Sequence, residues 1–348
     1  MSPGKSITAS TVTPAPWRPK AKARRNRSHE STAFAFLLPL VALEFVLVVV
    51  PLALAVYYSL YRVDYFELTS FRGFGNYVTV LTSPMVLKAV VSTIVFAAGS
   101  LVLTLGFGFA LALRFEVDTR TSVAMRSIVL VPYVISMLVG SLLLRWLYSS
   151  DGGLSSMALS SVGMGDFSIL ADPNAAMAAL VSNAVWRDSA FAMILLLAGL
   201  KSIPQELHAA ARVDGASAWM RFHRITLPML RIPLLIAVVR LLIHFVNVLT
   251  FALVLTGGGP NNATQTMGLA LYRLGFVDFQ LGEANALATL VFLFNIALIS
   301  GLLGVQSIGL GLLAELVVRT YFESQGRTSY PIAKRIGFPP VRALPKGE

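Results

Sequence analysis

Four side chains able to bind a polar solute recur at helical spacing within one apolar segment. They are Arg240, His244, Asn247 and Phe251, and one continuous helix would place them on a single face. Ionisable groups are costly at membrane depth, so such groups indicate a cavity or an internal pair. Amide donors beside an aromatic ring suit a sugar, whose hydroxyls surround a less polar ring face. Alternatively, these groups satisfy one another or a neighbouring subunit, and the pattern leaves both interpretations open.

Other polar residues interrupt two further apolar segments. Asn183 and Trp186 lie in one of them and Asn295 in the other, and each could serve packing or bind a ligand. Arg187 and Asp188 are adjacent, so on a helix they point in different directions and need not pair. We therefore take Asn183, Trp186 and Asn295 as additional candidates for a solute pathway.

The sequence contains no arrangement typical of an enzyme or a metal site. The chain has no cysteine, which excludes thiolate metal sites, catalytic thiols and disulfides. The four histidines lack the spacing of metal ligands, and no nucleophile and base are suggested. A phosphate loop of the form Gly-x-x-x-x-Gly-Lys-Ser/Thr is missing. We expect no metal, no cofactor and no catalytic residue in this chain; an intramembrane enzyme or a receptor-like protein would be the rivals from other classes.

The composition is that of an integral membrane protein. Of the 348 residues, 56% are hydrophobic and 13% are charged, whereas soluble domains have about 45–50% apolar and about 25% charged residues. The apolar residues fall into blocks that are each long enough to cross a bilayer, which takes roughly 20 residues. The six blocks are 33–61, 89–113, 123–147, 176–200, 229–256 and 284–313.

Basic residues are distributed unevenly among the segments that join these blocks. Most Lys and Arg residues lie in the N-terminal tail, in 114–126, in 201–231 and after 318, whereas 148–175 has none. By the positive-inside rule this predicts six spans with both termini in the cytoplasm, although 62–88 departs from the bias. The net charge of +11 is then a topology signal, and we expect contact with lipid but not nucleic acid. The predicted organisation is a disordered basic tail (1–32), a six-span domain (33–313) and a second cytoplasmic tail (314–348).

The connection 201–228 is predicted to be a helix–turn–helix. Ser202 with Gln205 would make a capping box at its start, and 206–213 favours a helix. Gly215, following Asp214, would break that helix, because glycine readily takes the left-handed conformation. The small side chains of 209–211 would let another protein approach closely. A helix resting on lipid headgroups is the alternative.

This connection resembles the EAA loop of ABC importer permeases, in which Glu-Ala-Ala is followed at fixed spacing by Gly, Ile and Leu-Pro. The family's glutamate position is Ala209 here, and Glu206 lies one helical turn earlier. Other segments are similar to the maltose and multiple-sugar branch of the family. They are Gly75-Asn76-Tyr77, Leu255 to Pro260, and Gly282 with Ala286. The matching loop residues are Ala210, Ala211, Gly215, Ile225, Leu227 and Pro228, with Asp214 beside them.

The resemblance implies an all-α, six-helix bundle of the type I ABC importer permease kind in the bacterial inner membrane. Such a permease works with a second homologous permease, two copies of a cytoplasmic ATPase that bind ATP and Mg, and an extracytoplasmic solute-binding protein. The ATPases would dock at the residues of the EAA loop, Glu206 and Ala209 among them. The implied cargo is a sugar, with a di- or oligosaccharide favoured, moved by alternating access. Glycerol phosphate, a polyamine or another small organic solute is the alternative cargo.

Overall fold

The computed structural model describes residues 27–64, 66–164 and 167–324 of the chain. Residues 1–54 and 55–348 form two compact units. The described part of the first unit belongs to one helix, α1 (Arg27–Ser59), which continues into the second unit. Its stretch from Leu37 to Ser59 is long and apolar enough to cross a membrane.

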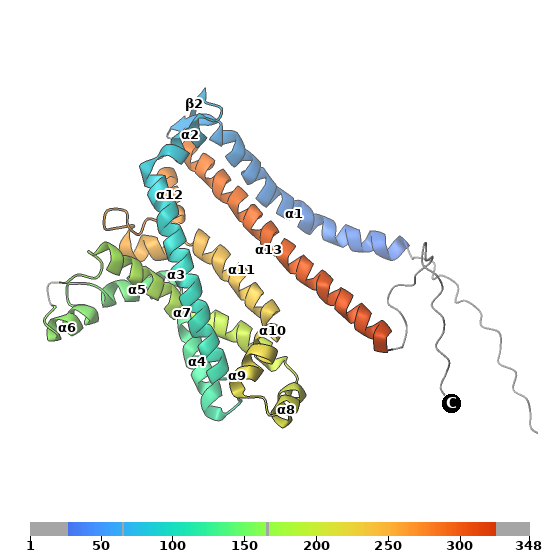
Figure 1. Cartoon of the computed structure of the whole chain (residues 1–348). Helices are drawn as coiled ribbons and strands as arrows, with labels where there is room; N and C mark the ends of the chain where they lie inside the picture. The colour runs from blue at the N-terminus through green and yellow to red at the C-terminus, as the bar shows by residue number, and fades with distance from the viewer. Residues whose placement is uncertain (1–26, 65, 165–166, 325–348) are drawn as a thin grey trace, which may run out of the picture. The chain divides into compact units, whose positions relative to one another are not determined.

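Among its described residues, the second unit is helical apart from one hairpin at its start (Figure 1). The hairpin pairs β1 (Tyr61–Asp64) with β2 (Glu67–Phe71) in antiparallel register, Tyr61 opposite Phe71. The further elements, in chain order, are α2 (Gly75–Thr82), α3 (Pro84–Arg114), α4 (Arg120–Val134), α5 (Met137–Leu147), α6 (Leu154–Ser161), α7 (Pro173–Lys201), α8 (Gln205–Val213), α9 (Ala218–Arg221), η1 (Phe222–Thr226), α10 (Leu227–Met229), α11 (Arg231–Asn247), η2 (Ala252–Thr256), α12 (Met267–Tyr272), η3 (Arg273–Val277) and α13 (Leu281–Ser324).

The described residues contain five helices long and apolar enough to span a membrane, or six if one bent pair counts as a span. The bent pair is α4 with α5, which meet at an angle of 94°. The apolar block 123–147 is therefore not one straight helix but a bent pair that can count as one span. The chain is extended at Ile135 and Ser136, and Pro132, which lacks an N–H to donate, lies in the last turn before the break.

The fifth apolar block is also interrupted. Helix α11 ends at Asn247, because Val248 has extended backbone, with ψ of 123°. The helical path resumes at residue 250 and ends in the π-helical turn η2. Arg240, His244 and Asn247 share one helix as predicted, but Phe251 lies beyond the break, so the predicted continuous face of four residues is wrong.

Two other boundaries differ from the sequence prediction. Helix α1 begins at Arg27 and α13 continues to Ser324, so helical structure extends beyond residues 33 and 313. The rest of both predicted tails lies outside the described residues. The predicted capping box is wrong: the N-cap of α8 is Pro204, and the Ser202 hydroxyl donates to the carbonyl of Gly199.

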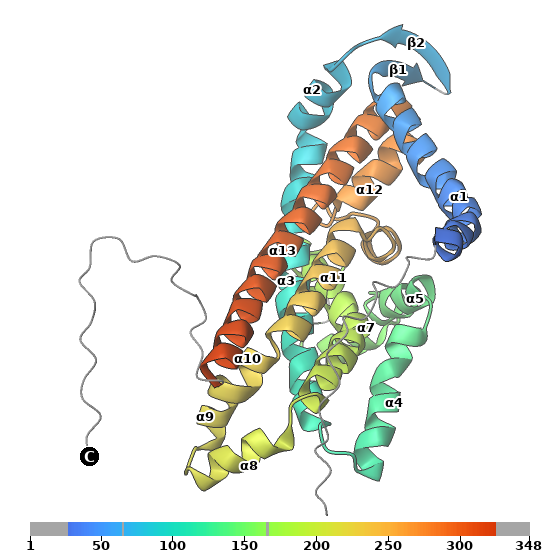
Figure 2. The ribbon, with the colours of Figure 1, turned by 90° about the vertical axis from the view of Figure 1, so that its right-hand side faces the viewer.

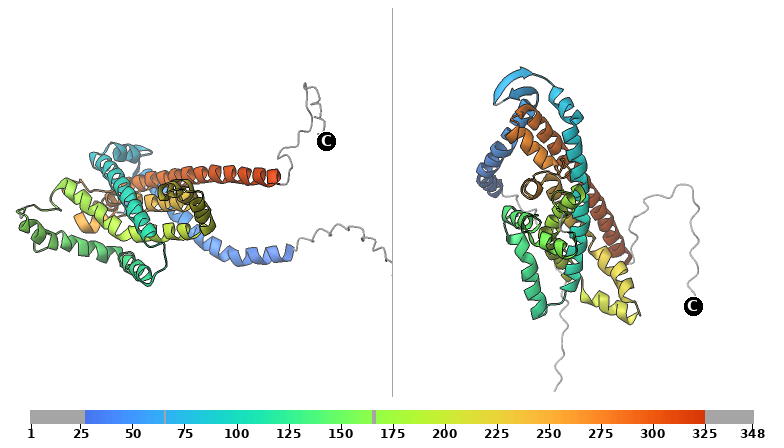
Figure 3. Two further views of the ribbon diagram at one scale, coloured as in Figure 1. Left: turned by 60° about the horizontal axis from the view of Figure 1, so that its bottom comes forward. Right: turned by 90° about the vertical axis from the view of Figure 1, so that its left-hand side faces the viewer.

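The core of the second unit forms where α3, α7 and α11 meet. Figures 2 and 3 show α7 beside α3, and α11 is in contact with both α3 and α13. Phe96 of α3 packs edge-to-face on Phe245 of α11, their ring centroids 5.8 Å apart, and both rings are fully buried. Leu180 of α7 belongs to the same apolar cluster. These contacts fix the relative positions of the helices that carry the polar residues described below.

Close packing of α3 on α7 depends on Gly108. A Cβ atom at this position would lie 2.5 Å from Cβ of Ala192 and 2.9 Å from the carbonyl oxygen of Ser189. A Cβ atom at Gly106, which lies about half a turn away on the same helix, would meet nothing within 4 Å. The two glycines therefore form a matched pair for mutation.

We expect Gly108→Ala to lower the melting temperature of the purified protein and Gly106→Ala to leave it unchanged or raise it. Alanine favours a helix over glycine by about 1 kcal/mol, but at position 108 the methyl group must push the two helices apart. Fluorescence-detected size-exclusion chromatography after heating measures both variants. Equal melting temperatures would show that α3 and α7 do not need this close approach.

Candidate functional site

The connection between α7 and α11 adopts the predicted helix–turn–helix. Helix α8 ends at Val213, and Gly215 follows with φ of +77°. The side chain of Ser217 then accepts a hydrogen bond from the N–H of Met220 and caps α9. The predicted first helix, glycine turn and short second helix are confirmed in form.

The first helix of this connection is exposed along its whole length. None of the residues of α8 is buried; Glu206, Ala209 and Ala210 are exposed and Ala211 is partly exposed. Val213 at its end is 88% exposed. A short helix whose small and apolar side chains face outward is a surface suited to contact with another protein.

The second half of the connection is fastened to the core. Trp219 stacks on Phe222 and lies 4.0 Å, centroid to centroid, from the ring of His223. Phe222 in turn contacts Phe109 of α3. Ile225 packs against the apolar cluster at the ends of α3 and α7, whereas Leu227 is half-buried and Pro228 is exposed. One half of the loop is therefore exposed and the other half anchored.

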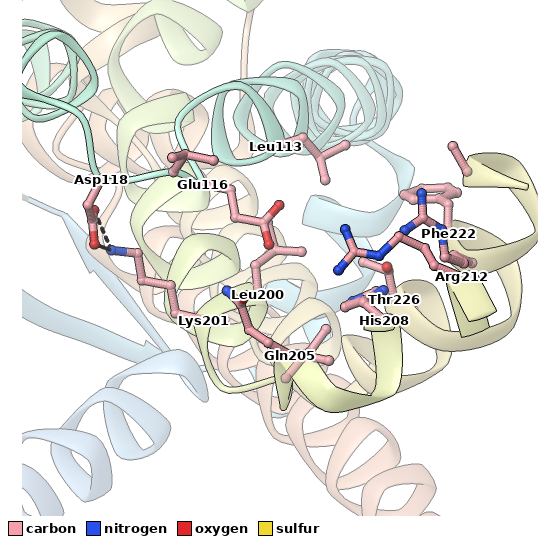
Figure 4. Close-up of a pocket in the computed structure, with 14 residues that line it drawn as sticks. Leu113, Glu116, Asp118, Leu200, Lys201, Gln205, His208, Arg212, Phe222 and Thr226 are labelled. Atoms are coloured by element: carbon pink, nitrogen blue, oxygen red, sulfur yellow. Dashed lines mark hydrogen bonds and ion pairs between the residues drawn. The ribbon is translucent and has the colours of Figure 1, made fainter. Parts of the chain in front are cut away.

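A hollow of about 640 Å³ lies between α8 and the 115–119 connection (Figure 4). Its charged lining comes from both sides, with Glu116 and Asp118 on the connection and His208 and Arg212 on α8. Asp118 accepts a hydrogen bond from the Lys201 ammonium at 2.6 Å and another from Arg126 at 2.7 Å. The carboxylate thus joins the base of the loop to α4.

These two cations set the acidity of Asp118. The hydrogen bond from Lys201, followed by the one from Arg126, holds the pKa of the Asp118 carboxyl below its ordinary value of 3.8. The side chain is 61% exposed, so the pairs are screened by water. The carboxylate is charged at neutral pH and keeps both partners.

The polar groups inside the spans converge on one buried carboxylate. Asp188 of α7 is fully buried. Its Oδ1 lies 3.2 Å from Arg187 and 3.7 Å from Arg240, and its Oδ2 lies 3.4 Å from Nε2 of His244. The expectation that Arg187 and Asp188 need not pair is wrong, since their side chains turn toward each other.

Aromatic groups complete this cluster, which we call the Asp188 cluster (Asp188, Arg187, Arg240, His244, Tyr133 and Phe191). Arg240 stacks over Phe191, 4.3 Å from its centroid, and donates a hydrogen bond to the Tyr133 hydroxyl at 3.3 Å. Arg187 lies over the Tyr133 ring at 5.1 Å and donates to the Tyr133 carbonyl. Tyr133 is at the end of α4, so the bent third block contributes directly to the cluster.

The remaining candidates fall into two groups. Asn247 and Asn295 exchange two amide hydrogen bonds, at 2.9 and 3.0 Å, between α11 and α13, and Trp186 is 37% exposed. Asn183 and Phe251, by contrast, are fully buried. Asn183 donates to the Ser141 hydroxyl, and Phe251 packs edge-on against His244, so the structure places both in the packed interior.

The candidates predicted from the sequence for the solute pathway do not include Asp188 or Tyr133. One signal could have found Asp188: it is the sole acidic residue in 84–114, 120–147, 173–201 and 231–256. A lone buried carboxylate needs cationic partners, and Arg187, Arg240 and His244 are among the basic residues in these segments. Tyr133 had no comparable signal, because the bend that brings it to α11 does not show in the pattern. No group of three or more His, Cys, Asp or Glu suited to a metal ion occurs within the described part of the chain.

Residues 103–308 match the family model described as binding-protein-dependent transport system inner membrane component. The chain is 33% identical over 272 residues to the trehalose/maltose transport system permease protein MalF of Thermococcus litoralis, covering 76% of this chain and 91% of that protein. It is 30% identical over 267 residues to the sn-glycerol-3-phosphate transport system permease protein UgpA of Brucella abortus, covering 76% and 91%.

A solved structure has a similar fold. It is a chain of a bacterial ABC transporter involved in the import of the acidic polysaccharide alginate, with a TM-score of 0.69 at 24% identity, covering 82% of this chain and 96% of that one.

Fold and site together define a multi-pass helical membrane protein with five or six candidate spans and a structured loop between α7 and α11. The chain belongs to the family of binding-protein-dependent transport system inner membrane components, and it is a permease subunit of an ABC importer. The resemblance stated from the sequence is confirmed.

The pairs made by Asp118 give a pH prediction. Because the pKa of Asp118 is lowered in the folded protein, its stabilising effect is present above the ordinary pKa and is lost as pH falls through the lowered one. We expect Asp118→Asn to reduce the melting temperature slightly and by a constant amount between about pH 5 and 8, and the two curves to begin converging as pH falls below about 4 and to meet only once pH has fallen through the lowered pKa. Asp151→Asn, in the 148–175 connection, is the control. A difference that persists at lower pH would exclude this ion pair as its source.

Proposed function

We propose that this chain is one of two homologous permeases in an ATP-driven importer of the bacterial inner membrane. It carries a sugar, with a di- or oligosaccharide favoured, by alternating access. The observation that carries the proposal is the helix–turn–helix between α7 and α11, exposed at α8 and anchored at η1. Family membership supports it, and so does the name of the relative MalF, a trehalose/maltose permease.

In this proposal α8 is the coupling helix of the permease. Two copies of a cytoplasmic ATPase bind ATP and Mg and dock against its exposed side, where Glu206, Ala209 and Ala210 lie. The position of the family's glutamate is Ala209, and Glu206 lies one helical turn earlier at a separate position of the family's pattern. Because Ile225 and Leu230 are packed into the ends of α3 and α7, a displacement of the loop moves the spans with it.

The proposed topology has six spans and both termini in the cytoplasm. It counts α4 and α5 as one broken span and places the 201–231 connection, with its excess of basic residues, on the same side as the termini. The hairpin of β1 and β2 then lies on the outer side, where a solute-binding protein would deliver cargo. The division into a basic tail, a permease domain and a second tail stays a prediction.

The proposed solute pathway runs along α11. Arg240, His244 and Asn247 supply donors from that helix, and Asn295 faces them from α13. Amide and guanidinium donors match the hydroxyls of a sugar, and the exposed Trp186 offers a ring face nearby. Phe251 packs against His244 of this row, whereas Asn183 is bonded to Ser141 of α5.

A second cargo keeps the same fold and mechanism. The relative UgpA is named as a glycerol-3-phosphate permease, and the cationic Arg240 near the row of amides would suit an anionic solute. Uptake measurements must therefore include both neutral and phosphorylated solutes.

The first experiment is a gentle purification of the tagged chain with mass spectrometry of the associated proteins. We expect a second six-span permease and an ATPase, which would then be reconstituted with their binding protein for uptake assays with maltose, trehalose and glycerol 3-phosphate. Recovery of the chain alone, under conditions that preserve other membrane complexes, would contradict the importer assignment.

The coupling role of the loop has its own test. Gly215→Val forces a β-branched residue into a left-handed conformation that costs it at least about 1 kcal/mol, and so distorts the turn after α8. We expect normal membrane insertion but at least tenfold less uptake per ATP hydrolysed in the reconstituted complex.

Gly163→Val is the matched control for this variant. Gly163 also has a positive φ, +81°, and like Gly215 has open space around it, but it lies in the 148–175 connection. Equal effects of the two substitutions would mean that general strain, and not coupling through α8, explains the loss.

A further inference from the structure

We propose that the Asp188 cluster is a binding site for an acidic group, a carboxylate, sulfonate or phosphate, carried by the transported solute. The inference rests on the proposed function, because it assumes that the polar row of α11 faces the solute pathway. It narrows the proposed cargo to those solutes, sugars included, that carry a negatively charged group.

The first step is the balance of charge. Two guanidiniums, Arg187 and Arg240, and the imidazole of His244 surround a single carboxylate, Asp188. Within the described spans from α3 to η2 no second acidic residue exists to neutralise them. Even with His244 neutral, the cluster carries one net positive charge inside the membrane.

The second step is to identify the cation that is most exposed and least neutralised by Asp188. The Arg187 side chain is only 12% exposed, and it is hydrogen-bonded to Asp188 and to the Tyr133 carbonyl. Arg240 is different, because its side chain is 36% exposed. It lies farther from Asp188, at 3.7 Å, than Arg187 does. The uncompensated charge is therefore centred on Arg240, the member nearest to open space.

The third step concerns what can face this charge. A guanidinium directed at lipid hydrocarbon is strongly unfavourable, so its exposed edge must meet water, a solute or an acidic group of a neighbouring subunit. Phe191 beneath the guanidinium and the Tyr133 hydroxyl at its side hold it in one orientation. Asp188 acts here as a positioning residue, because it fixes Arg240 and His244 toward the same space. A prealigned, net positive pair of donors is the arrangement that binds an anion.

The absence of cysteine from the chain allows a direct test in the purified complex. Asn247→Cys places one thiol on the exposed row of α11, one turn beyond His244. The thiol is treated with two methanethiosulfonates, the anionic sulfonatoethyl reagent and the cationic trimethylammonioethyl reagent. The rate of each reaction is measured from the increase in mass of this chain. Both rates are divided by those of a free thiol in solution. Ser161→Cys, exposed on α6 away from the cluster, is the control.

We expect the corrected ratio of anionic to cationic rates to be at least about 10 at Asn247→Cys, and near 1 at Ser161→Cys. A net unit charge two helical turns away, roughly 10 Å, at an effective dielectric constant of about 20, is sufficient for this preference. The local potential also changes the ionisation of the thiol, but it does so equally for both reagents and cancels in the ratio.

Two background substitutions should move the ratio in opposite directions. Arg240→Gln removes the exposed charge and should bring the ratio close to 1, whereas Arg240→Lys keeps it. Asp188→Asn removes the compensating carboxylate and should raise the ratio further. If Asp188→Asn does not yield a stable complex, the two Arg240 variants decide the question without it.

The possible outcomes separate this inference from the proposed function. If Asn247→Cys reacts with both reagents at a ratio near 1, the pathway exists but carries no net positive charge at this point, for example because a partner subunit supplies an acidic residue. The inference that the site binds an acidic group is then wrong. If Asn247→Cys reacts with neither reagent while Ser161→Cys reacts with both, the α11 row does not face a pathway, and the proposed pathway fails together with the inference.

Discussion

The burial of one carboxylate, Asp188, among cations of two helices is the interaction on which the interior of this protein depends. A charged group in the core of a membrane protein is tolerated only when partners compensate it. Here the partners come from α7 itself and from α11, and Arg187 and Arg240 both also reach Tyr133 at the end of α4. The same residue therefore fixes three helices and orients the donors that we assign to the solute pathway.

Helix α7 connects this cluster to the loop proposed to receive the ATPases. Asp188 lies in its interior, and Lys201, at its end, forms the ion pair with Asp118 at the base of the loop. On the other side of the loop, α11 begins at Arg231 and carries Arg240 within three turns. A movement of α8 and α9 thus acts on both helices that share the Asp188 cluster. Alternating access would change the cluster first, because its longer contacts, 3.4 and 3.7 Å, are those between α7 and α11.

Much of this architecture could be predicted from the sequence. Apolar block length located the spans, and the glycine turn at Gly215 with its flanking helices followed from local preferences. The breaks at Ile135 and Val248 could not be predicted, because neither isoleucine nor valine ends a helix by itself and both residues lie within long apolar segments that are typical of membrane-spanning helices. For the same reason Phe251 was assigned to the helix of Arg240, from which the break at Val248 separates it. The pairing of Arg187 with Asp188 was missed because helical periodicity describes Cβ directions, whereas long side chains can turn back toward a neighbour.

The central claim is that the contact between Asp188 and Arg240 holds α7 to α11, and a double-mutant cycle tests it most directly. Asp188→Asn, Arg240→Gln and the double variant would be purified in the complex and their thermal stabilities compared with the wild type. Our account predicts that Asp188→Asn is strongly destabilising and that adding Arg240→Gln restores much of the loss, with a coupling on the order of 1–3 kcal/mol. Simple addition of the two single effects would contradict it, and would mean that the two side chains are stabilised independently of each other.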